Sequence, residues 1–147
     1  MKRVFLDTTV LVYAMGRSHP LRPACVDILQ ANASGQIQAH TTPTVIQEFV
    51  QFYAQHKARK EAVKLAKNFM DVLTIVNPGQ METEEALSLF GKYRLAPSEA
   101  ALVATAISSD AHALVSADKR FQGIPGLAWW TPQQCLLEAD RVKVRRA

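Results

Sequence analysis

The sequence lacks most features that mark exported, zinc-binding or membrane-embedded proteins. Its 147 residues include only two cysteines, Cys25 and Cys135, and neither belongs to a CxxC pattern. Both stand in helix-like apolar contexts, which favours buried thiols over disulfides or a zinc site. No apolar run has the length needed to span a bilayer, and the N-terminus has no secretion-signal pattern. We therefore expect a cytoplasmic protein that does not interact with membranes.

Repeats, low-complexity stretches and long linkers are also missing, which predicts one domain. The composition, 48% hydrophobic and 20% charged, is typical of a globular protein with its own core. The net charge of +4 suits either a polyanionic partner or ordinary surface lysines. Part of the excess lies in the final "RVKVRRA". We expect a folded domain over residues 1–140 and a basic C-terminal tail over residues 141–147.

Short apolar runs alternate with helical patterns along the chain. The runs, which lack polar alternation and so suit strands buried on both faces, are "RVFL" from Arg3, "IQAH" from Ile37, "LTIV" from Leu73, "ALVS" from Ala113 and "LAWW" from Leu127. The helical patterns are "PACVDILQANASG", "TPTVIQEFVQFYAQH", "KEAVKLAKNFM", "METEEALSLFGKY", "PSEAALVATAISSDA" and "TPQQCLLEADRV". The alternation predicts an α/β domain with a mostly parallel central sheet flanked by helices. Ligands of such sheets bind beyond the carboxyl ends of the strands.

Two acidic residues follow predicted strands and therefore belong at that edge. Asp7 interrupts the apolar stretch "VFLDTTVLVYA", and Asp118 lies in "LVSADKRF". Asp7 has a simpler interpretation as the N-cap of a helix that starts at Thr8, and Asp118 as the cap of a turn leading to Phe121. An isolated buried carboxylate is costly, so a buried Asp7 needs hydrogen bonds, a proton or a metal ion.

Two further acids lie on predicted helices, next to their apolar faces. Glu48 adjoins the apolar stripe of "TPTVIQEFVQFY", where a solvated flank residue is the simpler interpretation. Glu99 is in the first turn of "PSEAALVATAI", where it suits the helix dipole. Its face also carries Leu102 and Val103, so it leans toward the core. If all these acids converge on one rim, they repel each other unless cations hold them. Oxygen-only clusters suit Mg²⁺ or Mn²⁺, which predicts phosphate-ester chemistry.

Four segments in order resemble the signatures of PIN-domain ribonucleases, and in particular VapC-type toxins of bacterial toxin–antitoxin pairs. The segments are "VFLDTTVLVYA", "TTPTVIQEFV", "LAPSEAALVATAI" and "ALVSADKRF". The resemblance implies a single PIN-like domain and metal-dependent endonucleolytic cleavage of RNA. It implies that the catalytic and metal-binding acids are Asp7, Glu48, Glu99 and Asp118, with Mg²⁺ as cofactor and Mn²⁺ as an alternative.

The resemblance also implies supporting residues and partners. Thr9 and Ser116 match hydroxyl positions that orient the acids, and Ser116 replaces a usual Thr. Glu99 replaces a usual Asp and adds one methylene. A cognate antitoxin is expected to cover the acidic site, and a homodimer is expected through apolar residues on the early helices. From the sequence itself, Lys119, Arg120 and Arg17 are candidates for contacts to RNA phosphates.

Three alternatives compete with this interpretation. A haloacid-dehalogenase-type phosphatase also has an Asp after its first strand, but it needs a second Asp two residues later, where this chain has Thr9. A non-catalytic PIN-like module that binds RNA or protein is left open by the Glu99 departure, although four retained carboxylates argue against it. A purely structural α/β domain would leave the convergence of the acids unexplained.

Overall fold

The computed structural model describes residues 1–16 and 18–146, with side chains described up to residue 141. The strands are β1 (Lys2–Leu6), β2 (Ile37–Thr41), β3 (Thr74–Ile75), β4 (Ala113–Val115) and β5 (Trp129–Trp130). The helices are α1 (Thr8–Met15), α2 (Arg22–Ala33), α3 (Pro43–Ala54), α4 (Arg59–Val72), α5 (Gln80–Lys92), α6 (Pro97–Ser108) and α7 (Pro132–Arg146). A 3-10 helix, η1, covers Lys119–Phe121. Each predicted strand and helix is present, which confirms the α/β class.

The strands form one sheet in the order β3-β2-β1-β4-β5, and every pairing is parallel. The chain builds outward from β1 to β3 and then returns to add β4 and β5 on the other side. The order therefore reverses between β1 and β4. Crevices at such a reversal are the usual ligand sites of open parallel sheets. Asp7 directly follows β1, and Ser116 directly follows β4.

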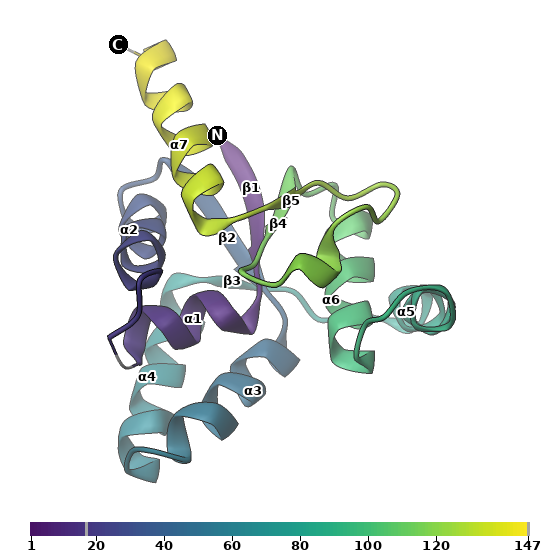
Figure 1. Cartoon of the computed structure of the whole chain (residues 1–147), viewed down its shortest axis with the longest axis horizontal. Coiled ribbons are helices and arrows are strands. Elements are labelled where there is room, and N and C mark those ends of the chain that lie inside the picture. Colours follow the sequence, from purple (N-terminus) through teal and green to yellow (C-terminus); the bar gives the residue numbers. More distant parts are fainter. Residues whose placement is uncertain (17, 147) are drawn as a thin grey trace.

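Two groups of helices cover the sheet. Right-handed crossovers on the outward and return journeys place their helices on opposite faces. In Figure 1, α1, α2 and α7 lie to the left of the sheet, whereas α5 and α6 lie to its right. The helices α3 and α4 pack against each other below α1. The space beyond the carboxyl ends of β1 and β4 is therefore bordered by α1, α3 and α6.

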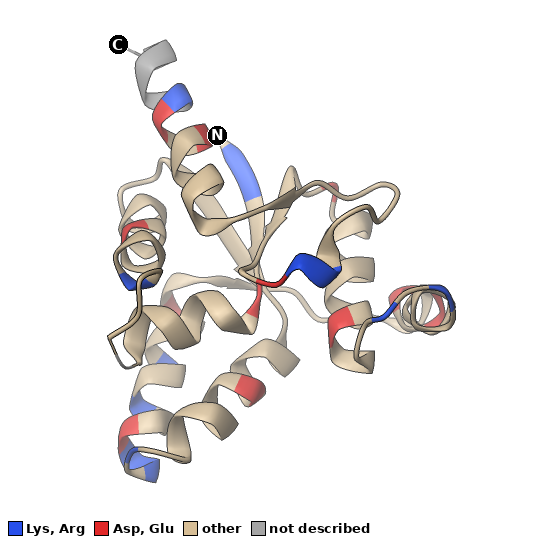
Figure 2. Ribbon diagram, viewed as in Figure 1, with Lys and Arg blue, Asp and Glu red and all other residues tan. Residues whose placement is uncertain are grey.

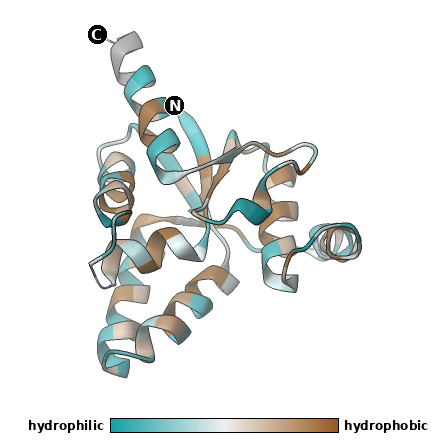
Figure 3. Cartoon of the chain, viewed as in Figure 1, coloured by the Kyte–Doolittle hydropathy of each residue, from teal (hydrophilic) through white to brown (hydrophobic). Residues whose placement is uncertain are grey.

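The central strands are buried because their residues are apolar on both faces. Along β1, exposure falls from the partly buried Lys2 and Arg3 to the fully buried Val4, Phe5 and Leu6. Figure 3 shows this change in colour, from hydrophilic at the start of β1 to hydrophobic further along. All of β4 is buried as well. The two strands thus form a rigid base, and both end at the same edge.

The segment after Asp7 forms the helix that the capping interpretation of Asp7 predicted, although no helical pattern marked it in the sequence. Residues from Thr8 to Met15 form α1, which begins immediately after β1. Asp7 occupies the N-cap position, but its side chain makes no capping hydrogen bond. The helix is apolar on several sides because it packs against both α2 and α3. Its composition therefore hides the helical period on which the prediction relied.

The C-terminal helix runs across the predicted domain boundary. Helix α7 continues from Pro132 to Arg146, so the backbone of the basic tail extends a helix. Arg141 forms an ion pair with Glu138 at 2.9 Å, and the side chains after it lie outside the described part. A separate role for residues 141–147 stays a prediction. Among the described residues, no helix is both long and apolar enough to cross a membrane.

Both cysteines are buried, as the sequence predicted. Cys25 on α2 and Cys135 on α7 are fully inaccessible and unbridged, and their helices pack together. Burial raises the pKa of Cys25 to about 11 and that of Cys135 to about 12. Both thiols therefore stay protonated near neutral pH and act as small apolar residues.

Helix α3 depends on an aromatic cluster for its position. Phe49 is fully buried, meets Phe69 of α4 edge-on at 4.9 Å and stacks against Tyr53 at 5.4 Å between ring centroids. We expect Phe49→Ala to lower the free energy of unfolding by about 3–5 kcal/mol in urea denaturation, because it opens a cavity. Phe52→Ala is the matched control, since Phe52 lies on the same helix but is 50% exposed. Equal losses for the two variants would contradict this packing.

Candidate active site

Asp7 is held at the mouth of the sheet by hydroxyl groups from two neighbouring segments. The side chain is only 6% exposed. Its Oδ2 accepts hydrogen bonds from Ser116 Oγ at 2.7 Å and from Thr9 Oγ1 at 3.1 Å. Ser116 Oγ also accepts the backbone N–H of Asp118 at 3.0 Å. The loop after β4 is thus tied directly to the carboxylate after β1.

Glu48 approaches the same region from α3. It sits beside the buried stripe of Val45, Ile46 and Phe49, which turns its helix toward the core. Its Oε2 accepts a hydrogen bond from Thr8 Oγ1 at 3.0 Å. Thr8 is the first residue of α1, directly after Asp7. Two consecutive residues therefore contribute to the site. Asp7 supplies a carboxylate, and Thr8 positions the carboxylate of Glu48.

Glu99 and Asp118 face each other across a shared arginine. Glu99 Oε1 accepts the backbone N–H of Ala96 at 2.8 Å, which caps the start of α6. Glu99 Oε2 lies 3.1 Å from the Arg120 guanidinium. Asp118 accepts the guanidinium on Oδ2, from Nε at 2.8 Å and from a terminal nitrogen at 2.5 Å. Its Oδ1 accepts the backbone N–H of Arg120 at 2.9 Å, so Asp118 also caps η1.

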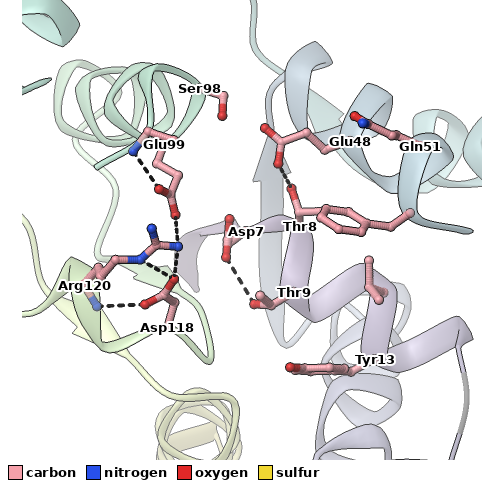
Figure 4. A pocket seen from close by; sticks show the side chains of 13 residues that line it. Asp7, Thr8, Thr9, Tyr13, Glu48, Gln51, Ser98, Glu99, Asp118 and Arg120 are labelled. Atoms are coloured by element: carbon pink, nitrogen blue, oxygen red, sulfur yellow. Dashed lines mark hydrogen bonds and ion pairs between the residues drawn. The ribbon is translucent and has the colours of Figure 1, made fainter. Parts of the chain in front are cut away.

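All four acids line one cavity of about 540 Å³. Figure 4 shows Glu99 and Asp118 on one side of the cavity, Glu48 on the other side and Asp7 between them. In Figure 2, acidic segments after β1, on α3, on α6 and before η1 border the same region. Within the described ranges, however, no group of three or more acids, histidines or cysteines is gathered closely enough to hold a metal ion. Instead, Arg120 occupies the position between two of the acids.

Comparison with known proteins identifies this arrangement. Residues 4–127 match the model of the PIN domain. The chain belongs to the PIN-domain family. Across 121 residues, which make up 80% of this chain and 83% of the relative, it is 42% identical to Ribonuclease VapC7 of Mycobacterium tuberculosis. This PIN domain is therefore a homologue of a VapC ribonuclease.

Solved structures of other PIN domains share the fold. The VapBC2 complex of Rickettsia felis bound to a promoter DNA fragment matches with a TM-score of 0.68 and 18% identity, covering 88% of this chain and 98% of that chain. VapBC-1 of nontypeable Haemophilus influenzae matches with a TM-score of 0.69 and 15% identity, covering 89% of this chain and 98% of that chain. At these identities the likeness concerns the fold. It agrees with the single PIN-like domain that the sequence predicted.

Burial and mutual repulsion set the charge state of this PIN-domain site. Burial raises the pKa of Asp7, and the Glu48 charge adds to the rise against the opposing hydrogen bonds from Ser116 and Thr9. Burial likewise raises the pKa of Glu99. Arg120 has the opposite effect on Asp118, because its side-chain hydrogen bonds hold the pKa of that carboxyl below its usual range. Four carboxyl groups thus share the cavity with one guanidinium, and burial favours the protonated form of two of them.

The donor atoms of the four acids suit a divalent cation in their chemistry, although Arg120 stands between two of these acids. Each of the four acids offers carboxylate oxygens, the ligands that Mg²⁺ and Mn²⁺ prefer. A cation would also offset the burial that raises the pKa of Asp7 and Glu99. Asp7 is fixed by two hydroxyl groups, and Glu48 by one. Such outer hydrogen bonds are typical supports of metal-binding carboxylates.

Of the residues predicted to contact RNA, one lines the cavity and one lies outside it. Arg120 lines the cavity, whereas Lys119 is exposed on η1 and is not part of the lining. Arg17 lies outside the described residues. The sequence interpretation missed Thr8, although it directly follows Asp7, and it missed Gln51 and Ser98, which also line the cavity. Thr8 was hidden because its partner, Glu48, is 40 residues away in the chain.

The raised pKa of Asp7 predicts a stability gain in Asp7→Asn. Since the native state binds the Asp7 proton more tightly than the unfolded chain does, ionised Asp7 lowers native stability. This cost is present above the native pKa and disappears as the pH falls below the ordinary value of 3.8. We expect Asp7→Asn to raise the unfolding free energy of the metal-free protein by about 1 kcal/mol at pH 7.5.

Urea denaturation at pH 7.5 and at pH 3.5 checks this prediction, with the gain absent at the lower pH. The amide oxygen of the substituted side chain keeps an acceptor for Ser116 and Thr9, so the variant changes charge more than packing. Asp27→Asn is the control, since Asp27 is exposed on α2. A loss of stability in Asp7→Asn at pH 7.5 would show that the buried charge is already compensated.

Proposed function

We propose that this protein is a metal-dependent endoribonuclease and the toxin component of a type II toxin–antitoxin pair. The observation that carries the proposal is the convergence of four carboxylates, from four separate segments, on one cavity at the sheet reversal. Membership of the PIN-domain family and 42% identity to Ribonuclease VapC7 support it. The order of strands and helices brings these acids together beyond the carboxyl ends of β1 and β4.

We assign catalytic and metal-binding roles to Asp7, Glu48, Glu99 and Asp118. Mg²⁺ would supply a water nucleophile of lowered pKa and stabilise the leaving oxygen, and Mn²⁺ would substitute for it. Asp7 is the most rigid ligand, because Ser116 and Thr9 both hold its Oδ2. Thr8 orients Glu48 in the same way.

The substrate we propose is RNA, cut at its phosphodiester bonds. Arg120 and Lys119 are placed at and beside the cavity, where a guanidinium or ammonium group would contact the backbone phosphates. The net charge of +4 is consistent with a polyanionic substrate. Such a substrate agrees with a cytoplasmic location.

We also propose two protein partners. A cognate antitoxin would cover the acidic cavity, as the VapBC complexes among the structural neighbours suggest by their names. A homodimer would bury exposed apolar side chains, which concentrate on α4 and α5 rather than on the first two helices of the described chain. They include Val63, Met70, Val72, Met81, Leu87 and Phe90.

A non-catalytic PIN-like module is the second candidate. The pairing of Arg120 with Glu99 and Asp118 favours it, because a cation already neutralises part of the acidic site. Such a module would bind RNA or protein without cutting. For purified protein incubated with RNA, this candidate predicts metal binding without cleavage.

Incubation of the partner-free protein with total bacterial RNA tests the function. We expect cleavage with Mg²⁺ or Mn²⁺, none with EDTA, and a rate at least about 100-fold lower in Asp7→Asn, because a principal ligand is lost. Asp27→Asn is the control for an exposed charge and keeps the wild-type rate. Cleavage that persists in EDTA or in Asp7→Asn would contradict the metal-dependent mechanism. Metal binding without cleavage of any RNA would favour the non-catalytic module.

A second experiment asks why Glu99 replaces the usual Asp. One Glu99 oxygen caps α6 at Ala96 while the other reaches Arg120, and the shorter Asp side chain cannot span both contacts. We expect Glu99→Asp to lower stability by about 0.5–1 kcal/mol and to change Mn²⁺ affinity by about two- to tenfold.

Glu82→Asp is the matched control for this substitution. Glu82 occupies the same position in α5, where it accepts the backbone N–H of Gly79 at 3.1 Å, but it does not line the cavity. It should lose similar stability in thermal denaturation and keep the wild-type Mn²⁺ affinity in calorimetry. If Glu99→Asp leaves both the RNA cleavage rate and the Mn²⁺ affinity unchanged, the extra methylene does not tune the site.

A further inference from the structure

The four acids do not have equivalent hydrogen-bond partners. The side chains that donate to Asp7 and Glu48 in the contacts described above are neutral hydroxyl groups. Glu99 and Asp118, in contrast, share the cationic Arg120 side chain. Hydroxyl groups can stay bonded to a carboxylate that binds a metal ion, whereas a guanidinium at the same oxygens repels that ion.

Arg120 uses the oxygens that a metal ion would need. Its guanidinium contacts Oε2 of Glu99 and Oδ2 of Asp118. The remaining oxygen of each acid accepts a backbone N–H, from Ala96 for Glu99 and from Arg120 itself for Asp118. Figure 4 shows the guanidinium between the two carboxylates, on the side of the cavity opposite Glu48. Both halves of this acid pair are therefore already satisfied within the chain.

The Arg120 guanidinium can leave the two carboxylates without a change in the rest of the fold. The Arg120 side chain is 54% exposed, whereas those of Glu99 and Asp118 are 13% and 24% exposed, so water reaches the guanidinium end of both ion pairs. Its backbone is anchored in η1 by the Asp118 cap and by the fully buried Phe121. The guanidinium can therefore move away while η1 and the Asp118 main chain stay in place.

We propose that Arg120 is an internal counter-ion that competes with the divalent cation for Glu99 and Asp118. The inference rests on the proposed function, because it takes these acids as metal ligands. In the metal-free protein, Arg120 balances part of the acidic charge by pairing with both carboxylates. Binding of the cation exchanges the guanidinium for the ion. Arg120 is thus a positioning residue that sets the metal affinity of the site.

Calorimetric titration with Mn²⁺ tests the competition without any RNA. We expect Arg120→Gln to bind Mn²⁺ about three- to tenfold more tightly than the wild type, since two ion pairs no longer have to be broken. Lys119→Gln is the matched control, because it removes the same charge from the neighbouring exposed residue of η1. Its affinity should rise by less than about twofold, as expected for a screened surface charge. Equal affinities in the two variants, or weaker binding by Arg120→Gln, would overturn the proposal.

A second measurement uses the unmodified protein and so does not depend on how the variants fold. The Arg120 Nε–H, which donates to Asp118 in the metal-free protein, gives its own nitrogen–proton NMR signal. Saturating Mg²⁺ should shift this signal toward that of a solvated arginine, and an unchanged signal would overturn the proposal. The proposed function is tested separately: it is rejected if the wild-type protein binds Mn²⁺ but does not cleave RNA. Absence of Mn²⁺ binding by wild type and Arg120→Gln alike would reject both.

Discussion

Repulsion between carboxylates confined to one cavity is the constraint around which this structure is organised. Four acids line a cavity of about 540 Å³, and burial raises the pKa of Asp7 and Glu99. Such a cluster survives in a folded protein only when hydrogen bonds or cations compensate the charge. Each acid here has its own compensation, by hydroxyl groups for Asp7 and Glu48 and by Arg120 for Glu99 and Asp118.

The parallel sheet supplies the rigidity that this compensation needs. Because β1 and β4 are buried neighbours that end at one edge, the residues that follow them stay within hydrogen-bond reach. The Asp7 main chain reinforces this contact, since its N–H donates to the Val115 carbonyl at 3.0 Å. The arrangement is typical of a site whose ligands must keep their positions before a cation arrives. Because burial raises the pKa of Asp7, a charge at this position is expected to lower stability, a common trade at functional sites.

Much of the fold could be read from local patterns. Continuous apolar runs identified all five strands, and Gly35, which closes the helical pattern "PACVDILQANASG", follows the end of α2 with a positive φ of 80°. Helix α1 was indicated only by the capping interpretation of Asp7, because contacts with two other helices make it apolar on several sides and hide its helical period. The simpler interpretation of Asp118 as a turn cap is confirmed, and it holds alongside the position of this acid in the cavity. The capping interpretation of Asp7 is not, since the Asp7 side chain bonds to Ser116 and Thr9 instead.

Residue types and their order along the chain were enough to indicate the α/β class, the strand ends and the acids that gather there. They were enough because the apolar patterns that mark buried strands and helices lie within short stretches of sequence. The pairing of individual atoms depended on the folded chain. Ser116 meets Asp7 across 109 residues, and Arg120 meets Glu99 across 21. Contacts of this kind follow from sheet register and from the direction of each side chain, which no local pattern encodes. For this reason the sequence presented Arg120 only as a candidate contact to RNA phosphates, and the fold placed it between two acids.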